Sequence, residues 1–406
     1  MSDRRVVVTG IGLLAGVGIG REKVWDALVD GRCGIGKPKM FDTTGYRSEL
    51  AAEIPGVETA GRFSPLERRR LSRSDQVAIL AAGEALNDAG LDGALPAERT
   101  GVVLGAGTAD LRRNEEYMRI ARRRGFRWAP PSQIFNHFSS TPVDVVGECF
   151  GCQGPRSCIV AACSSSTVAI GYAGDLIRAG MADVMLAGGS DVLCHLTVSG
   201  FNALRLVDRN PCRPFDVGRA GMNIGEAAAV LVLETLSSAR RRGASVYAEL
   251  RGYAAACEAF HPTAPEPEGQ TIAATIARAL QAARLDPGDV DHVNAHGTAT
   301  VHNDRAEARA FHRAFGARTR RIPVTSIKSM VGHCLGAAGG LEAAVLALTI
   351  ARGVVPPTIH HETPDPDCRQ LDVVAGTARE VRVRHGISTS LAFGGNDSAL
   401  VLSAVG

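Results

Sequence analysis

The sequence predicts an α/β protein in which strands of buried sheets alternate with packed helices. Short apolar runs of strand length alternate along the chain with longer segments whose apolar residues recur at helical spacing. The chain has 406 residues, of which 45% are hydrophobic, so it is long enough for a large core or for two fused domains. Strands that alternate with helices in this way are typical of α/β folds.

The first half of the chain shows both patterns in alternation. The apolar run that follows Arg4-Arg5 is interrupted by Thr9 and by glycines up to Gly20, so it predicts a strand and a loop rather than a secretory signal. The strands expected in this half are Val6–Thr9, Gly101–Leu104, Cys158–Ala162, Val184–Ala187 and Ala227–Leu233, and the expected helices are Ser74–Ala89 and Cys163–Ala179.

The second half continues the alternation. No short repeat occurs, but each half places a reactive-looking residue between a strand and a following helix, which is compatible with two fused α/β halves that meet at a shared site. The polar stretch Arg240–Gly243 is the expected boundary, which gives tightly packed domains at 1–243 and 244–406. The expected strands are Ser245–Gly252, Val290–Ala295, Val324–Ser326 and Ser398–Ser403, and the expected helices are Gly269–Ala283, Asp304–Phe315 and Gly336–Ile350.

Composition disfavours several functional classes. The net charge of +3 is too small to indicate nucleic-acid binding. No uninterrupted apolar stretch approaches the ~18–20 residues that cross a bilayer. The 10 cysteines have no secretory context and no zinc-like spacing with histidine, which favours free thiols in a reducing compartment. We therefore expect a soluble, cytoplasmic protein with no metal site and no nucleic-acid or membrane partner.

Cys163 is the most informative single residue. It follows a short apolar run and precedes a segment of helical periodicity, so we expect it at a strand-to-helix turn, on a helix N-terminus. Free backbone N–H groups and the positive end of the helix dipole favour a thiolate there, and the thiolate is the nucleophilic form. Taken alone, however, the residue favours the simpler interpretation as a small buried hydrophobe, which is what most cysteines in a reduced protein are.

Two histidine motifs change that balance. The first is Asn294–Thr300, in which His296 stands beside a glycine and near two hydroxyl residues; this composition suits a loop that approaches a ligand closely. The second is Lys328–His333, which precedes a helix rich in glycine and alanine that contains Glu342. Two histidines beside glycines at strand exits, together with a helix-capping cysteine, indicate a catalytic site rather than three unrelated structural residues.

These motifs resemble those of the β-ketoacyl-acyl carrier protein synthases, the ketosynthase branch of the thiolase-like condensing enzymes. The resemblance runs nearly end to end and implies a thiolase-like fold, in which two fused α/β halves form a layered α-β-α-β-α architecture. The matching motifs are Val8–Gly12, Arg213–Asp216, Gly225–Ala227, His296–Thr300, Lys328–His333, Pro356–Thr358, Pro364–Pro366 and Phe393–Gly395.

The resemblance implies a decarboxylative Claisen condensation. Cys163 would accept an acyl chain from the phosphopantetheine of an acyl carrier protein as a thioester. His296 and His333 would assist decarboxylation of a malonyl thioester and stabilise the enolate, which then attacks the acyl group to give a β-ketoacyl thioester. Imidazole can supply such hydrogen-bond donors near neutral pH, and the sequence signals no metal or redox cofactor.

The resemblance also implies supporting roles. Lys328 would orient the histidine region, with Glu342 as its partner. Backbone N–H groups of Cys163 and Phe393 would form the oxyanion hole, and Phe393 matches the gating phenylalanine of the family. The implied substrate-binding residues, of which the two threonines would contact the pantetheine arm, are Thr298, Thr300, Phe393 and Gly394.

Several motifs depart from the usual family pattern. These departures are more typical of ketosynthases of specialised type II pathways, such as those that make polyenes or other polyketides, than of housekeeping fatty-acid synthases. The departure near the C-terminus bears on chain-length preference more than on the chemistry. The departing segments are Ser164–Ser166, Arg219–Met222, Gly225–Ala229 and Gly394–Asp397.

Acidic acyl carrier proteins need a basic docking face. Arg69 and Arg70 match the family's docking positions and lie in a cluster with Arg68 and Arg73. A second cluster, Arg122 to Arg127, is more simply a solvated helix face. The resemblance further implies a dimer, either a homodimer or a heterodimer with a ketosynthase-like subunit, and places its interface and the floor of the acyl pocket at Gly107–Thr141.

Three other functions remain as alternatives. A non-catalytic chain-length partner would lack the active cysteine, whereas this chain carries Cys163, His296 and His333. A non-elongating acyltransferase would use Cys163 without condensation. A thiolase would carry a second reactive cysteine in place of the paired histidine motifs.

Overall fold

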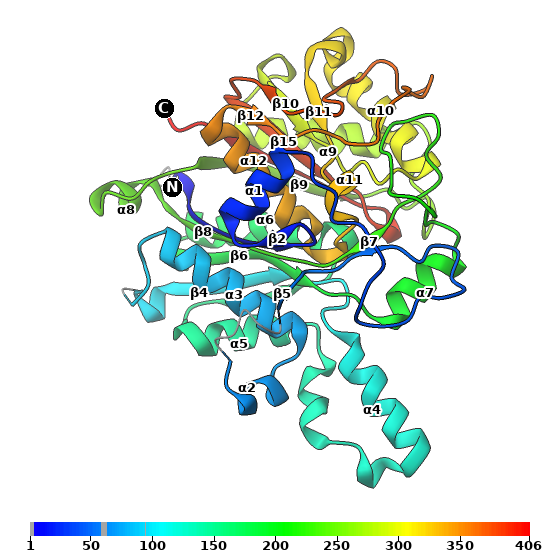
Figure 1. Cartoon of the computed structure of the whole chain (residues 1–406). Coiled ribbons are helices and arrows are strands. Elements are labelled where there is room, and N and C mark those ends of the chain that lie inside the picture. The colour runs from blue at the N-terminus through cyan, green and yellow to red at the C-terminus, as the bar shows by residue number, and fades with distance from the viewer. Residues whose placement is uncertain (1–3, 58–62, 94) are drawn as a thin grey trace.

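The computed structural model describes residues 4–57, 63–93 and 95–406. Its layers run α-β-α-β-α through the molecule, because the strands of the two halves form separate layers. The outer layers are α9 (Gln270–Ala283) and α10 (Val301–Phe315) at the top of Figure 1, and α3 (Arg73–Asp88) and α5 (Thr141–Phe150) below the strands of the first half. The fold is therefore the layered α/β architecture that the sequence predicts.

The first half forms one side of the central sheet, in the order β5-β4-β6-β8-β1. The three strands β4, β5 and β6 pair in parallel, and β8 and β1 extend them antiparallel. Their bounds are β1 Val6–Ala15, β4 Thr100–Gly105, β5 Arg156–Ile159, β6 Val184–Asp191 and β8 Ala227–Thr235.

The second half repeats this plan in the order β11-β10-β15-β16-β9, with β13 beyond β11. Here too the strands β10, β11 and β15 are parallel, and β16 and β9 extend them antiparallel. Their bounds are β9 Ala248–Cys257, β10 His292–Asn294, β11 Pro323–Thr325, β13 Asp372–Val373, β15 His385–Ser390 and β16 Asn396–Ser403.

The two halves join through one short antiparallel contact, in which Val6–Val8 of β1 pairs with Ala248–Leu250 of β9. Within the described residues this contact makes a single sheet of twelve strands, with β2 (Gly18–Ile19) attached to β1. The remaining short strands pair outside that sheet and are β3 Ala51–Ala52, β7 Ile224–Gly225, β12 Val354–Val355 and β14 Arg379–Glu380.

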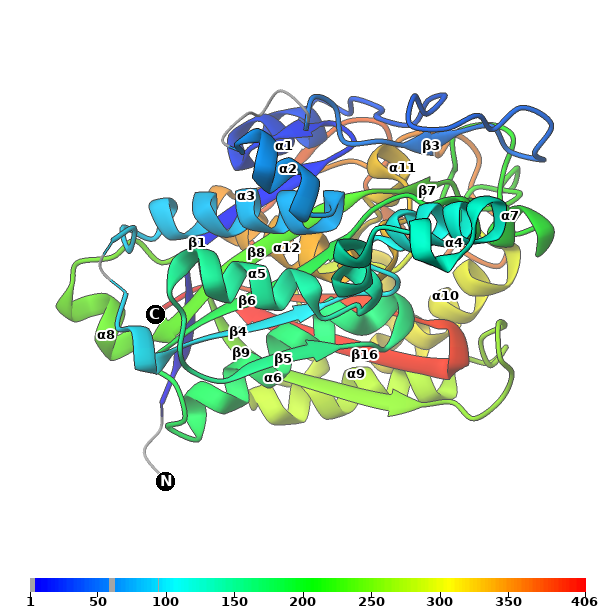
Figure 2. The ribbon, with the colours of Figure 1, turned by 90° about the horizontal axis from the view of Figure 1, so that it is seen from below.

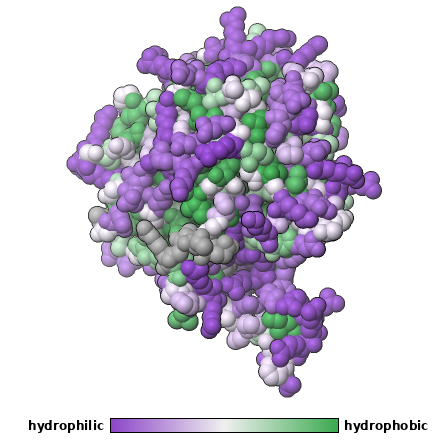
Figure 3. All heavy atoms as spheres, in the orientation of Figure 1, coloured by the Kyte–Doolittle hydropathy of each residue, from purple (hydrophilic) through white to green (hydrophobic). Residues whose placement is uncertain are grey.

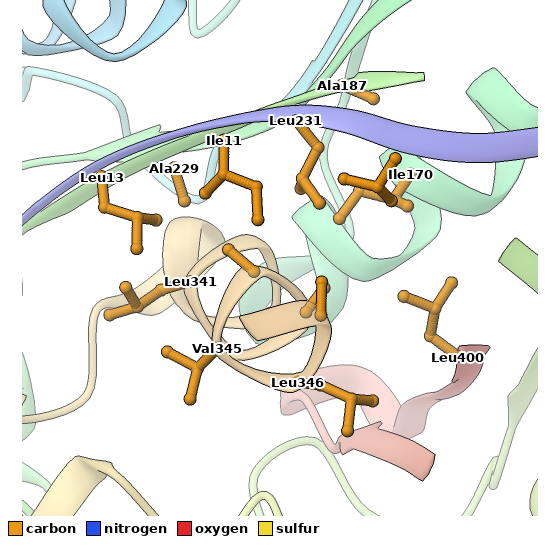
Figure 4. Close-up of a cluster of buried hydrophobic side chains, with 14 of the residues drawn as sticks. Ile11, Leu13, Ile170, Ala187, Ala229, Leu231, Leu341, Val345, Leu346 and Leu400 are labelled. Atoms are coloured by element: carbon orange, nitrogen blue, oxygen red, sulfur yellow. The ribbon is translucent and has the colours of Figure 1, made fainter. Parts of the chain in front are cut away.

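Two central helices, α6 (Ser165–Arg178) and α12 (Ala338–Arg352), lie between the two sides of the sheet and against each other. Figure 4 shows α12 inside a cluster of apolar side chains: Leu341 and Val345 of the helix lie near Leu13 of β1, and Leu346 lies toward Leu400 of β16. The segment 335–352 is long and apolar enough to cross a membrane by composition, but it is the buried central helix of this core.

The outer helices cover the sheet from both sides. Helix α3 (Arg73–Asp88) packs so closely on β1 that a Cβ atom on Gly12 would lie 1.9 Å from the Ala81 carbonyl oxygen. The glycines at positions 10 and 12 therefore serve close approach of a helix to a strand. The other outer helices are α5 Thr141–Phe150, α9 Gln270–Ala283 and α10 Val301–Phe315.

Helix α4 (Leu111–Arg124) stands away from the layered body, with the 3-10 segments Phe126–Trp128 and Pro131–His137 beside it. Figures 1 and 2 show this protrusion from two directions, and in Figure 3 its visible face is largely hydrophilic with a small apolar patch. The remaining helices are α1 Arg21–Val29, α2 Pro65–Arg70, α7 His195–Ala203, α8 Leu236–Arg241 and α11 Lys328–Val331.

Most elements expected from the sequence are present, with shifted ends. The strand expected at Val6–Thr9 continues to Ala15 and then turns into the β1–β2 hairpin instead of a loop. The strand expected at Cys158–Ala162 ends at Ile159, because the chain must turn before Cys163. Strand β15 and the helices α1, α4, α5 and α7 were not predicted from the sequence.

Candidate active site

Cys163 lies at the turn from β5 into α6. Ala162 has the left-handed backbone angle φ 47°, and residues 162–164 form one turn of 3-10 helix before α6 begins at Ser165. The other half repeats this geometry: Leu335 has φ 50°, residues 335–337 form a 3-10 turn, and α12 begins at Ala338. Cys163 thus occupies the start of a central helix, as its sequence context predicts.

The expectation of a low pKa for Cys163 is wrong in this environment. Burial raises the pKa of the thiol to about 12, although the charge of Lys328 and the backbone N–H of Phe393 both act to lower it. The side chain is only 7% exposed, so loss of hydration outweighs the favourable end of the helix. The resting thiol is therefore protonated, and its proton must be removed during reaction.

Three serine hydroxyls fix the turn around Cys163. Ser165 Oγ accepts from the Ala161 N–H at 2.8 Å, and Ser166 Oγ accepts from the Gly340 N–H of α12 at 2.7 Å. Ser164 Oγ lies 2.8 Å from the Asn396 carbonyl oxygen. The serine run at 164–166, a departure from the usual family pattern, ties the cysteine turn to both neighbouring segments.

His296 follows β10 in a tightly held loop. Its backbone N–H donates to Glu307 Oε1 at 2.7 Å, and the N–H of Gly297 donates to Glu307 Oε2 at 2.8 Å. Gly297 has φ 41°, and a Cβ there would lie 2.6 Å from the Ser326 Cβ, so only glycine fits. The buried carboxylate of Glu307 on α10 therefore sets the path of the loop that carries His296.

A buried ion pair stands behind the histidine. Lys328 Nζ contacts the Glu342 carboxylate and lies 3.4 Å from His296 Nδ1. Lys328 begins α11 and Glu342 belongs to α12, and both are 1% exposed. Because the ammonium group can only donate, His296 Nδ1 acts as the acceptor and its hydrogen resides on Nε2.

The second histidine, His333, lies beside the first, with ring centroids 5.2 Å apart and the rings nearly perpendicular at 87°. Burial first, and the charge of Lys328 after it, hold the pKa values of His296 and His333 well below the usual value. Both imidazoles are therefore neutral at pH 7 and present N–H groups as uncharged donors.

These side chains face one cavity of about 50 Å³. Cys163, His296 and His333 line it together with Phe393, which stacks on Phe201 at a centroid distance of 5.5 Å. The expected pantetheine-contacting residues, Thr298 and Thr300, also line the cavity, and their hydroxyls lie 2.9 Å apart.

Among the described residues, three of the expected catalytic and substrate-binding residues lie outside that lining. Lys328 and Glu342 support the histidines from behind, and Gly394 lies next to Phe393 with its N–H donating to the Pro262 carbonyl at 2.8 Å. Glu258 and Asp397 do line the cavity and were not identified from the sequence. Asp397 lies in the segment Gly394–Asp397, which departs from the usual family pattern, so the sequence did contain a signal for it. No local pattern in the sequence distinguishes Glu258.

The basic clusters separate in the structure. Arg73 is not a surface residue: it is 6% exposed and its guanidinium lies 2.8 Å from the Glu226 carboxylate. Arg69 and Arg70 are exposed on α2, where Arg70 pairs with Glu148 of α5. In the second cluster, Arg124 and Arg127 each lie 5.3 Å from the centre of the Trp128 ring.

One Cys-x-x-Cys spacing occurs at the end of α5. Cys149 is exposed and Cys152 is buried, and both are free thiols. Burial raises the pKa of Cys152 to about 11, so this pair has no activated thiolate at neutral pH.

Fold and site together define a thiolase-like condensing enzyme. Residues 3–239 match the family model "Beta-ketoacyl synthase, N-terminal domain", and residues 247–362 match "Beta-ketoacyl synthase, C-terminal domain". The chain therefore belongs to the β-ketoacyl synthase family.

Characterised relatives place the chain near two groups in that family. It is 42% identical over 420 residues to the tetracenomycin polyketide synthase ketoacyl synthase alpha subunit of Streptomyces glaucescens, covering 99% of this chain and 97% of the relative. It is 38% identical over 406 residues to a 3-oxoacyl-[acyl-carrier-protein] synthase 2 of Staphylococcus aureus, covering 98% of each.

Solved structures agree with these relatives. The ishigamide ketosynthase/chain length factor superimposes with a TM-score of 0.94 at 34% identity, covering 99% of this chain and 100% of that chain. A type II polyketide synthase acyl-carrier protein in complex with its ketosynthase bound to the hexaketide gives a TM-score of 0.92 at 32% identity, with the same coverage. The protein is a ketosynthase-type condensing enzyme of polyketide or fatty acid synthesis.

Proposed function

We propose that this enzyme extends an acyl chain held on Cys163 by decarboxylative condensation with a malonyl-acyl carrier protein. The observation that carries the proposal is the convergence of Cys163, His296 and His333 on one cavity, with the Lys328–Glu342 pair behind them. This arrangement combines a nucleophile with two uncharged hydrogen-bond donors, which are the groups that the two half-reactions require.

In the first half-reaction the Cys163 sulfur attacks the thioester carbonyl of the acyl carrier. The thiol proton passes through a neutral imidazole in the cavity to the departing pantetheine sulfur, so a protonated resting thiol is compatible with turnover. The backbone N–H of Phe393, which faces Cys163, would stabilise the tetrahedral oxyanion together with the N–H of Cys163. A donor of this kind contributes roughly 3–4 kcal/mol to the transition state.

In the second half-reaction the malonyl carboxylate leaves as CO₂, and its bonding electrons pass into the enolate of the thioester. The N–H groups of His296 and His333 would donate to the enolate oxygen, and Lys328 keeps the hydrogen of His296 on Nε2. The enolate carbon attacks the acyl-Cys163 carbonyl, and the cysteine sulfur leaves and is reprotonated. The product is a β-ketoacyl thioester two carbons longer.

The substrates and partners follow from the same proposal. The acyl and malonyl groups arrive on the phosphopantetheine of an acyl carrier protein, whose arm would contact Thr298 and Thr300, and the enzyme holds no resident cofactor. Arg69 and Arg70 would dock the acidic carrier. Relatives named as a ketosynthase/chain length factor and as an acyl-carrier protein complex support these partners and a type II polyketide pathway.

We further propose a dimer whose interface includes the protruding segment 107–141, formed with an identical subunit or with a chain-length-factor-like subunit. The domain division at 1–243 and 244–406 and a cytoplasmic location belong to the same proposal. A heterodimer is supported by the ketosynthase/chain length factor neighbour at a TM-score of 0.94.

Intact-protein mass spectrometry after mixing with acyl-carrier thioesters tests the function. We expect an acyl adduct that is absent in Cys163→Ala and present in the control Cys33→Ala, which changes an exposed thiol. Addition of malonyl carrier should consume the adduct and yield the longer β-keto thioester. If the adduct persists with malonyl carrier but transfers to an added amine or alcohol, the enzyme is an acyltransferase and the proposed condensation is wrong.

A further inference from the structure

Two carboxyl groups meet in the wall of the cavity beside Cys163. Asp397 lies at the start of β16 and is 3% exposed, and Glu258 directly follows β9, the neighbouring strand. Both residues line that cavity, and each carboxyl group affects the pKa of the other. Asp397 Oδ2 and Glu258 Oε1 are buried oxygens with no hydrogen-bond donor within the described ranges. Two carboxyl oxygens can form a hydrogen bond with each other only if one of them carries a proton.

The surroundings favour retention of that proton. The other groups whose charges act on Asp397 are the carboxylates of Glu266, in the loop after Glu258, and of Glu307 on α10. Burial and the neighbouring Glu258 carboxyl raise the pKa of Asp397 to about 9, and burial raises the pKa of Glu258 as well. Asp397 is buried and Glu258 is half-buried beside it, so ionisation of both carboxyl groups near neutral pH is disfavoured and the pair holds one proton as a unit.

The pair joins the two segments that form this wall. The Glu258 N–H donates to the Gly395 carbonyl at 2.9 Å, and the Gly394 N–H donates to the Pro262 carbonyl at 2.8 Å. Gly394 and Gly395 have φ 79° and 73°, a tight turn that places Phe393 toward Cys163. The position of Phe393 therefore depends on how closely the 257–266 loop and the 393–397 segment are held together.

We propose that Asp397 and Glu258 share a single proton and act as positioning residues for Phe393, keeping its backbone N–H at Cys163 while the pair is protonated and releasing it when both carboxylates are charged. The proposal rests on the proposed function for its effect on catalysis, but the protonation state of the pair can be measured without turnover. We call the two residues the carboxyl pair.

The stability of the folded protein depends on pH because the pKa of the carboxyl pair differs between the folded and unfolded states. The raised pKa means that the folded state takes up a proton that the unfolded chain lacks at neutral pH, so the contribution of the pair is present at low pH and lost as pH rises through about 9. Asp397→Asn replaces the shared proton with an amide hydrogen bond that does not titrate. This variant should gain thermal stability relative to the wild type as pH rises from 6 to 9.

The first test uses no substrate. Infrared spectra of the full chain at pH 7 should contain a buried protonated-carboxyl band that disappears in both Asp397→Asn and Glu258→Gln, and that remains in Asp92→Asn, which changes an exposed carboxylate. The melting-temperature difference between Asp397→Asn and the wild type should widen with pH. An unchanged band, or a constant difference from pH 6 to 9, would overturn proton sharing.

The second test measures Cys163 acylation by acyl carrier at each pH. A small alkylating reagent measures the rise in thiolate with pH, and the acylation rate is corrected for it. The corrected rate of the wild type should fall several-fold between pH 8 and 9.5. Asp397→Asn should rescue the rate over that range, and Asp397→Leu should lose acylation at every pH. If the infrared result holds but Asp397→Asn keeps the wild-type profile, the positioning role is wrong. If no acyl adduct forms on wild-type Cys163 at any pH, the proposed function fails instead.

Discussion

At Cys163 burial and charge act in opposite directions, and burial prevails. The turn that starts α6 supplies the position, but the same packing that orients the thiol removes its hydration and raises its pKa to about 12. Burial and the charge of Lys328 lower the pKa values of the neighbouring His296 and His333, so these side chains are also held in the neutral form. The residues are thus poised as an un-ionised thiol beside two uncharged imidazoles, a state suited to proton transfer during acylation.

His296→Ala should separate the two half-reactions. The variant keeps Cys163 and the Phe393 N–H, so acylation should persist, whereas loss of the Nε2–H donor should slow malonyl decarboxylation by about 10²–10⁴-fold. Mass spectrometry of the carrier protein, which follows conversion of malonyl to acetyl groups, measures the second step. His302→Ala, on the exposed side of α10, is the matched control. Decarboxylation at the wild-type rate would show that His296 is not the donor.

At the scale of elements, periodicity located strands and helices more reliably than it located their ends. The strand expected at Cys158–Ala162 stops at Ile159, because the left-handed turn at Ala162 needs residues that propensity assigned to the strand. Helix α4 has arginine in its last turn and mostly polar faces, so it lacks the apolar stripe by which α6 was found. Helix α11 is only four residues long and all four are buried, so it shows no periodic pattern by which it could be predicted.

Gly12→Ala should destabilise the protein through the contact between α3 and β1. The added Cβ would lie 1.9 Å from the Ala81 carbonyl oxygen, so the helix must move away from the strand. Overpacking of a core typically costs about 1–3 kcal/mol, and a clash with backbone belongs to the upper part of that range. Thermal unfolding against Gly288→Ala, where an added Cβ meets nothing within 4 Å, provides the measurement and its control. Equal melting temperatures would contradict the close packing.

At the scale of the whole molecule, two halves of like topology place their central helices against each other. Cys163 lies in the 3-10 turn before one of them, and Gly336 occupies the corresponding 3-10 turn before the other. Loops from the second half then bring His296 and His333 to the cavity that Cys163 enters. The site belongs to neither half alone, which explains why its residues are far apart in the sequence.

Changes at Arg69 and Arg70 should weaken binding of the acyl carrier protein and leave the acylation step at Cys163 unchanged. Their double change to Glu places negative charge on α2, so the KM for acyl carrier should rise at least tenfold while acylation by a small-molecule thioester stays constant. The effect should shrink as salt increases, because surface charges are screened. Arg122 and Arg123 changed to Glu form the control. Equal KM values for both pairs would remove α2 from the docking surface.

Local patterns were enough to predict the α/β class and the family and to select Cys163, His296 and His333 as candidate site residues, because they consist of apolar periodicity, glycines beside reactive residues and motifs in a fixed order. The protonation of those groups, the burial of Arg73 against Glu226 and the placing of Asp397 and Glu258 in one cavity wall depend on tertiary contacts. The reason is physical: hydration and charge at a side chain depend on residues brought near it by folding, and spacing along the chain carries no measure of either.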